Sequence, residues 1–366
     1  MTHRTTRTAL RRAALAAAAA LACALSATPA AHAQQQAAPA ADDFERGKQL
    51  LARGDARGAA EALKRATVQR KNDGEVWEQL GSALSLSNKQ KEARKAFEKA
   101  VKLRPGSAAA HAGLAAALLL LDKTRDAERE ASRALALDAG VAAAHFVVGA
   151  AEGRSSNYRR AAQEAEEALR LQPNYPDAAW LLGDALLNLF VAENEFFVNQ
   201  YPLPQDADEE TTKAVIAKRE VAFDPFKARM RAAAERLEAL ADRRPGGATP
   251  ERARELAESL RAYGSGPRER SAFRQNEVTS KALITSKPEP GFTEKARKKN
   301  VTGVVRLRAV LAADGRVKYI LVVKGLPNGL TEKAIEAARQ IRFRPATING
   351  RPVSQFVVLE YNFNIY

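Results

Sequence analysis

The chain has 366 residues, enough for two or three domains, and a formal net charge of +15. Its hydrophobic fraction of 46% is that of a globular protein, and much of it is alanine, which favours helices. The single cysteine, Cys23, lies near the N-terminus. If this segment is removed, the remaining chain has no disulfide bond, no cysteine-ligated zinc and no thiol chemistry.

The first 33 residues have the pattern of a secretory signal peptide. Four arginines precede an alanine- and leucine-rich run at residues 13–27, and Ala31-His32-Ala33 has the form of a cleavage site. Two alternatives remain open. The uncharged residues 13–31 are close to the lower length limit for a retained membrane anchor, and residues 20–23 form a loose lipobox. We expect a periplasmic protein that begins at Gln34.

The positive charge lies at the C-terminal end of the chain. Residues 34–267 hold 35 basic and 35 acidic side chains, whereas residues 268–366 hold 19 basic and 8 acidic ones. In an exported protein, this surplus favours anionic envelope components or acidic peptide segments over nucleic acid as partners. A solvated charged face explains it equally well.

Residues 40–189 contain phased copies of a 34-residue repeat. Small residues recur at the eighth position of each copy: Gly47, Gly81, Ala115, Gly149 and Gly183. They allow the two helices of a repeat to approach closely, while larger residues fill the space between neighbouring repeats. The pattern resembles the tetratricopeptide repeat, with the best copy at residues 74–107, and predicts an all-α solenoid.

The resemblance implies that the first helix of each repeat lines a concave face that binds a protein partner. We expect five side chains on this face: Phe44, Glu78, Phe146, Trp180 and Asp184. The alternative is that Phe146 and Trp180 pack against the following helix.

His111 and His145 are also 34 residues apart, at equivalent positions where adjacent repeats pack. We therefore expect a structural role for them rather than a metal pair. The sequence lacks the short motifs of serine hydrolases, zinc proteases, P-loop enzymes and dithiol oxidoreductases. We expect no catalytic residues, no metal, no cofactor and no enzymatic activity.

The repeat phase is lost from Phe190 onward, and residues 190–264 are predicted to form a helical extension. Within it, residues 208–221 and 225–243 are predicted as separate helices, and Thr249 is predicted to cap a further helix that begins at Pro250. Residues 265–287 are predicted to be a linker.

Residues 288–366 have the pattern of a small α+β domain with the order helix, strand, strand, helix, strand. Apolar residues alternate over residues 304–312, and Asp314-Gly315 predicts a hairpin turn before the returning strand. A helical stripe follows at residues 330–341, and a last alternating strand at residues 357–365.

Several short motifs occur in a fixed order within this domain. They are Pro288-Glu289-Pro290 ahead of Phe292-Thr293, Gly303, Asp314-Gly315 with Val317, Phe343-Arg344-Pro345, and Asn349-Gly350 with Pro352-Val353. In this order they resemble the C-terminal domain of TonB-family energy transducers, which implies a three-stranded sheet.

In that family the domain binds an extended segment, the TonB box, of an outer-membrane receptor, and the segment adds as a strand beside the last strand. The resemblance implies that the peptide-binding edge consists of Phe356, Val358, Glu360, Asn362, Asn364 and Tyr366. It implies a second contact at Pro288, Pro290 and Phe292. The alternative is an ordinary strand that pairs within the monomer or in a homodimer.

The resemblance thus implies a TonB-like protein that takes part in transmembrane transport through an outer-membrane receptor. The family's long spacer rich in Pro, Lys and Glu is missing between leader and domain, and repeats take its place. The alternative is a soluble periplasmic assembly scaffold without energy transduction.

Overall fold

The structure is a computed structural model that describes residues 42–202, 204, 206–243, 247–265, 272–275 and 277–364. The predicted signal peptide, Cys23 and Tyr366 lie outside the described residues. The chain forms two compact units. The repeat unit contains the described chain up to Leu182 together with Asp242–Thr249, and the C-terminal unit contains Gly183–Ala241 and the chain from Pro250 onward.

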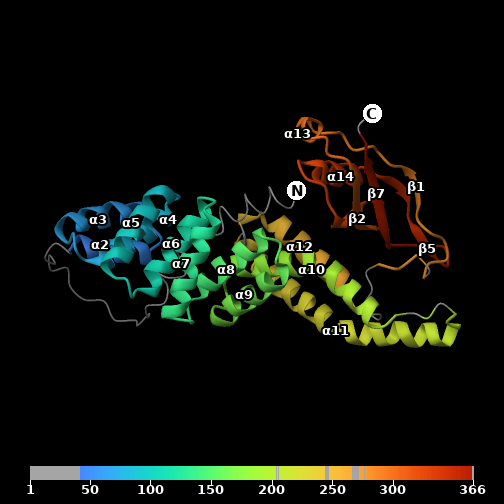
Figure 1. Ribbon diagram of the computed structural model, residues 1–366, viewed down its shortest axis with the longest axis horizontal. Helices are drawn as coiled ribbons and strands as arrows, with labels where there is room; N and C mark the ends of the chain where they lie inside the picture. Colours follow the sequence, from blue (N-terminus) through green and yellow to red (C-terminus); the bar gives the residue numbers. More distant parts are fainter. Residues whose placement is uncertain are drawn as a thin grey trace, which may run out of the picture. The chain divides into compact units, whose positions relative to one another are not determined.

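The repeat unit consists of helix pairs that follow one another in chain order (Figure 1). The helices are α2 (Asp43–Ala52), α3 (Ala56–Gln69), α4 (Gly74–Leu86), α5 (Gln90–Leu103), α6 (Ala108–Leu120), α7 (Thr124–Leu137), α8 (Ala142–Arg154), α9 (Tyr158–Leu171) and the first part of α10 (Pro176–Gln200). The first residues of α4, α6, α8 and α10 follow one another at the predicted 34-residue interval. This confirms the predicted helical solenoid.

Close packing around Phe97 explains why small residues recur in the repeats. The ring of Phe97, on α5, is 1% exposed. A Cβ atom added to Gly81 would lie 2.8 Å from this ring, and one added to Gly113 would lie 2.3 Å from it. Because both distances are shorter than an ordinary van der Waals contact, a larger side chain at either position would displace the ring.

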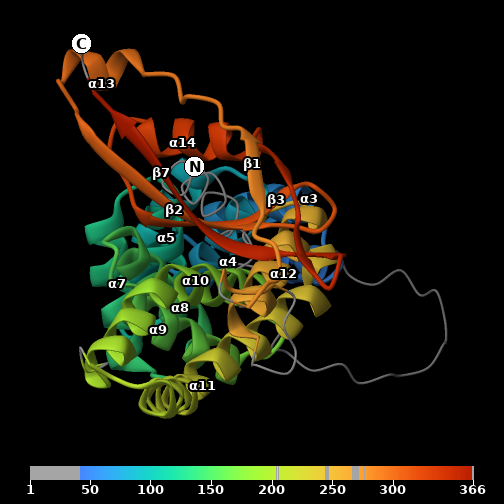
Figure 2. The same ribbon diagram turned by 90° about the vertical axis from the view of Figure 1, so that its right-hand side faces the viewer.

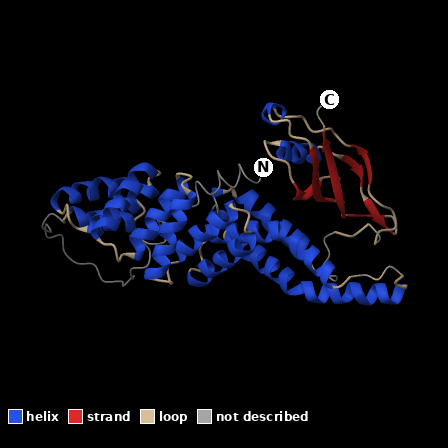
Figure 3. Cartoon of the chain, in the orientation of Figure 1, coloured by secondary structure: helices blue, strands red, loops and turns tan. Residues whose placement is uncertain are grey.

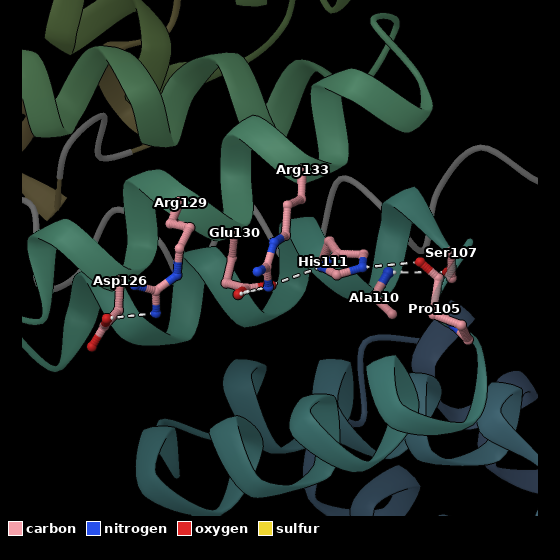
Figure 4. A network of polar contacts seen from close by, with 8 residues as sticks. All are labelled: Pro105, Ser107, Ala110, His111, Asp126, Arg129, Glu130 and Arg133. Carbon is pink, nitrogen blue, oxygen red and sulfur yellow. Dashed lines mark hydrogen bonds and ion pairs between the residues drawn. The ribbon is translucent and has the colours of Figure 1, made fainter.

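Each histidine of the repeat unit bridges the two helices of its own repeat, and Figure 4 shows the contacts of His111. Nδ1 of His111 lies 2.7 Å from the carboxylate of Glu130, and its Nε2 lies 3.1 Å from the carbonyl oxygen of Pro105. His145 repeats this arrangement with Glu164 at 2.7 Å and the carbonyl of Ala139 at 3.1 Å. The His111–Glu130 pair joins α6 to α7, and the His145–Glu164 pair joins α8 to α9. Both histidines therefore have a structural role.

The helical part of the C-terminal unit contains the rest of α10, α11 (Glu209–Ala239), the single turn η1 (Ala241–Arg243) at its border, and α12 (Pro250–Gly264). The prediction of separate helices at residues 208–221 and 225–243 was wrong, because α11 runs through Pro225 without a break. Proline costs the helix one hydrogen bond, but the flanking rings of Phe223 and Phe226 are buried and stack at 5.4 Å, which offsets that cost.

The sheet of the C-terminal unit is three-stranded and antiparallel, in the order β3-β2-β7. Its strands are β2 (Gly303–Leu311), β3 (Val317–Lys324) and β7 (Gln355–Phe363), and its helices are α13 (Glu294–Lys298) and α14 (Leu330–Arg339). Helix α14 lies against one face of the sheet (Figure 2), where Val305, Leu307 and Leu359 are buried beneath it. The predicted αββαβ order is confirmed.

Four short strands complete the C-terminal unit, and all strands of the described chain belong to it (Figure 3). β1 (Leu283–Ser286) pairs with β4 (Arg342–Arg344), and β5 (Ala346–Ile348) pairs with β6 (Arg351–Val353). The segment predicted as a linker therefore contains a strand and makes specific contacts with the domain that follows it.

The second face of the sheet is covered at one end by α12. Strand β3 has a bulge opposite the β2 segment from Arg308 to Val310, and Tyr319 within it has a left-handed φ of +52°. A bulge removes backbone groups from the ladder. The hydroxyl of Tyr263, on α12, donates to the carbonyl of Tyr319 at 2.6 Å and lies 3.2 Å from the carbonyl of Arg308. Burial raises the pKa of Tyr263 well above its ordinary value, so the hydroxyl keeps its proton.

We expect Tyr263→Phe to lower the free energy of unfolding by about 0.5–1.5 kcal/mol, because the partly buried carbonyl of Tyr319 loses its donor. Tyr361→Phe is the matched control, since the structure gives the buried hydroxyl of Tyr361 no hydrogen-bond partner in the described chain. Thermal unfolding of the full chain, followed by circular dichroism, measures both. Equal destabilisation by the two variants would contradict the role of Tyr263.

We expect His111→Ala to destabilise the repeat unit by about 1–3 kcal/mol, because Glu130 and the carbonyl of Pro105 both lose a buried partner. His145→Ala should cost less, since the side chain of His145 is 15% exposed and that of His111 is 6% exposed. Urea titration of the full chain compares them. If His145→Ala lowered the free energy of unfolding more than His111→Ala, burial would not determine the strength of these two His–Glu pairs.

Candidate functional site

Strand β7 forms one edge of the three-stranded sheet. On one side it pairs with β2 along its whole length, from Gly303 opposite Phe363 to Leu311 opposite Gln355. On its other side, the strand pairing within the described residues is a single parallel bridge between Phe273 and Gln355. Most of this side is therefore open to another strand.

The contacts of Phe273 show which backbone groups of β7 face the open side. The N–H of Phe356 donates to the carbonyl of Phe273 at 2.9 Å, and the N–H of Phe273 donates to the carbonyl of Ser354 at 2.9 Å. In a strand, alternate residues direct both their N–H and their C=O groups to the same side. The backbone groups of Val358, Glu360 and Asn362 consequently face the open edge as well.

The side chain of Lys287 lies across the open edge of β7. Its ammonium group donates to the carbonyl of Glu360 at 2.5 Å and lies 4.6 Å from the centroid of the Tyr361 ring. A lysine at a sheet edge discourages uncontrolled pairing with other strands. Phe273 thus pairs with the start of β7, and Lys287 occupies the carbonyl of Glu360. Neither contact involves the backbone N–H and C=O groups of Val358 and Asn362.

The side chains of β7 alternate between core and solvent. Leu359, Tyr361 and Phe363 are buried under the helices, whereas Val358 is 56% exposed and Glu360 and Asn362 are exposed. Glu360 accepts a hydrogen bond from Nε of Arg306 on β2 at 2.6 Å. The exposed face thus combines one apolar side chain with polar ones.

The residues predicted as a second contact lie in the extended segment after β1. The ring of Phe292 packs edge-on against Phe363 at 5.6 Å, with Arg297 on its other side at 5.9 Å. Pro288 and Pro290 are half-buried. The structure thus brings Phe292 to the C-terminal end of β7, where exposed Asn364 follows the strand.

The side chains predicted for the concave face of the repeats lie mostly inside the helix packing. Phe44 is 5% exposed, Trp180 is 8% exposed, and Phe146 is fully buried against Tyr175 at 5.3 Å. Phe146 therefore lies inside the packing of the repeats, where its ring contacts Tyr175 just ahead of α10. In this conformation the three aromatic side chains offer little surface to a partner.

Of the two acidic residues predicted for that face, Glu78 is buried and Asp184 is half-buried. The carboxylate of Glu78 accepts a hydrogen bond from Ser107 at 2.7 Å and lies 3.6 Å from Arg104, and burial raises its pKa. Asp184 lies in the C-terminal unit, where burial raises its pKa to about 6. A site for a partner of the repeats is not defined by these residues.

Sequence reasoning missed Phe273 and Lys287. Both fall in the segment predicted as a linker, and each finds its partner more than seventy residues downstream. One local pattern could have indicated a strand in this segment. Leu283 and Ile284 are two consecutive apolar residues in a polar stretch, and both belong to β1.

Comparison with known proteins agrees with this architecture. Residues 288–365 match the family model of the Gram-negative bacterial TonB protein C-terminal domain, and residues 74–107 match a tetratricopeptide repeat. The chain carries a TonB C-terminal domain behind tetratricopeptide repeats. Protein TonB of Vibrio cholerae serotype O1 is 28% identical over 89 residues, which are 24% of this chain and 36% of that protein. This chain thus spans about a third of the length of that relative.

Solved structures are similar to part of the chain. MamA from Desulfovibrio magneticus RS-1 is 22% identical, with 48% of this chain and 92% of that chain covered at a TM-score of 0.36. A thermophilic tetratricopeptide-repeat protein of Thermus thermophilus is 17% identical, and the match covers 48% of this chain and 96% of that chain at a TM-score of 0.36. In the part of the chain that the structure describes, no helix has both the length and the apolar character that crossing a membrane requires.

Proposed function

We propose that the TonB C-terminal domain binds the TonB box of an outer-membrane receptor by strand addition to β7, and that the repeats recruit a second protein. In this proposal the protein acts in the periplasm, in transport that depends on such receptors, and binds its partners without catalysing a reaction.

The row of backbone groups at Val358, Glu360 and Asn362 is the observation that carries the proposal. These groups face the open side of an edge strand whose other side is fully paired. A peptide that lies along β7 would satisfy them in the way that peptides join sheet edges in other domains. The surplus of basic residues in this part of the chain adds attraction for acidic peptide segments.

A proline at position 358 tests strand addition directly. Val358→Pro removes an N–H group that faces the open edge, and edge strands tolerate proline where the N–H group faces outward. We expect at least about tenfold weaker binding of a fluorescently labelled TonB-box peptide to the full chain, measured by fluorescence anisotropy, because the peptide loses a hydrogen bond and must move away from the ring of the proline.

Val358→Thr is the matched control, because it keeps the backbone N–H group and a β-branched side chain. It should bind the peptide as the unmodified chain does. Circular dichroism checks that both variants fold. If Val358→Pro folds and binds with unchanged affinity, or if the unmodified chain binds no box peptide, the peptide does not add to β7.

Lys287 should compete with the incoming peptide. We expect Lys287→Ala to strengthen binding of the same peptide by about three- to tenfold, because the carbonyl of Glu360 no longer has to give up an existing hydrogen bond. Lys287→Arg, which keeps a donor at this position, serves as the control. Weaker binding in Lys287→Ala would instead show that Lys287 contacts the peptide favourably.

The attachment of α12 to the sheet favours a second candidate function, that of a periplasmic assembly scaffold without energy transduction. Helix α12 ends at Gly264, and Phe273 already pairs with β7, so this part of the chain has little length to serve as a spacer. The scaffold function predicts a cleaved leader and full activity in cells that lack the inner-membrane proton channel. Intact-mass analysis that finds a retained leader would exclude it.

A further inference from the structure

The C-terminal unit contains a cavity of about 290 Å³ between its helical part and its sheet. Helices α10, α11 and α12 contribute to its walls, as do β2, β7 and the segment around Phe273. It lies on the face of the sheet opposite to α14. Of β7 it involves Phe356, which precedes the open edge from Val358 onward.

Aromatic rings form most of the apolar wall. The ring centroid of Phe190 lies 5.1 Å from that of Tyr263 and 5.6 Å from that of Phe223. Tyr263 lies 5.5 Å from Phe356, and Phe197 lies 5.4 Å from Phe223. These rings come from α10, α11, α12 and β7, so the wall exists only where the helices meet the sheet.

Positive charge predominates among the ionisable residues of the wall. Arg219, Lys227, Arg274 and Arg308 line the cavity together with two acidic residues, Glu220 and Glu277. Both acidic residues contact Arg274: Glu220 lies 3.3 Å from its guanidinium group, and Glu277 accepts from its backbone N–H at 2.7 Å. The wall therefore carries a surplus of positive charge that favours an anionic ligand.

Arg308 is the basic residue most clearly available to a ligand. Its guanidinium group lies over the ring of Phe190, 5.7 Å from the ring centroid. Within the described residues, no carboxylate lies at ion-pair distance from it. A half-buried guanidinium group on an aromatic ring, beside an empty apolar space, presents donors that a carboxylate can accept in a bidentate manner.

We propose that this cavity binds a small aromatic carboxylate. The ring of the ligand packs among Phe190, Phe223 and Tyr263, and its carboxylate accepts hydrogen bonds from Arg308. Apolar pockets with a few well-placed polar groups are typical of small-molecule sites, and a volume of about 290 Å³ is at the lower end of their range. The ligand is therefore of one- or two-ring size rather than a long acyl chain or a folded peptide.

Calorimetric titration of the full chain with 1-naphthoate tests the proposal, with the neutral 1-naphthamide as the matched ligand. We expect naphthoate to bind, and naphthamide to bind at least about tenfold more weakly, because a hydrogen bond between two charged groups is stronger than one to a neutral amide. Arg308→Gln should abolish this difference. Arg316→Gln, which removes an exposed arginine of the hairpin turn, should leave the affinity for naphthoate unchanged.

Methyl NMR on the unmodified chain locates the ligand even if Arg308→Gln does not fold. Naphthoate should shift the methyl signals of Ile216, which lines the cavity, and should leave those of Ile341, which is buried on the opposite face of the sheet, in place. The proposal is overturned if naphthoate does not bind at millimolar concentration, if naphthamide binds equally well, if folded Arg308→Gln retains full affinity, or if Ile341 shifts and Ile216 does not.

Discussion

The hydrogen bond from Tyr263 to the bulge of β3 sets how the C-terminal unit is assembled. The bulge frees the carbonyl of Tyr319 from the ladder, and this partly buried carbonyl needs another donor. The Tyr263 hydroxyl meets this requirement and holds α12 against the sheet. Because Phe190 on α10 packs on the same tyrosine ring, the helical extension and the TonB C-terminal domain form one compact unit.

This attachment divides β7 into two parts. Near its start, Phe356 packs against Tyr263 at 5.5 Å and its N–H group is paired with Phe273. Further along, the backbone groups of Val358, Glu360 and Asn362 face the open side, where Lys287 donates to the carbonyl of Glu360. The same contacts that fix the helices on the sheet therefore determine which length of the edge strand has no other strand beside it within the described residues. They also enclose the aromatic cavity beside it.

The regular parts of the fold could be predicted because each leaves a local pattern in the sequence. Small residues at 34-residue intervals predicted the helix pairs, and the packing of Phe97 against Gly81 shows why those residues are small. Alternating apolar residues predicted the three long strands and the buried side of β7. The same local reasoning failed at Pro225, because it judged the cost of a proline without the aromatic packing that offsets it.

By itself, the sequence determined the class of both parts, an α-helical repeat array and a small α+β domain, because helix and strand periodicity depend on neighbouring residues. Its resemblance to the TonB C-terminal domain pointed to the last strand as the strand that a peptide would join, and this stays a prediction. Only the tertiary structure decided that Phe146 and Trp180 are buried and that a supposed linker pairs with the sheet. Only the structure showed which backbone groups of β7 remain free. These outcomes depend on contacts such as Phe273 with Gln355, between residues too distant in the chain to produce a local pattern.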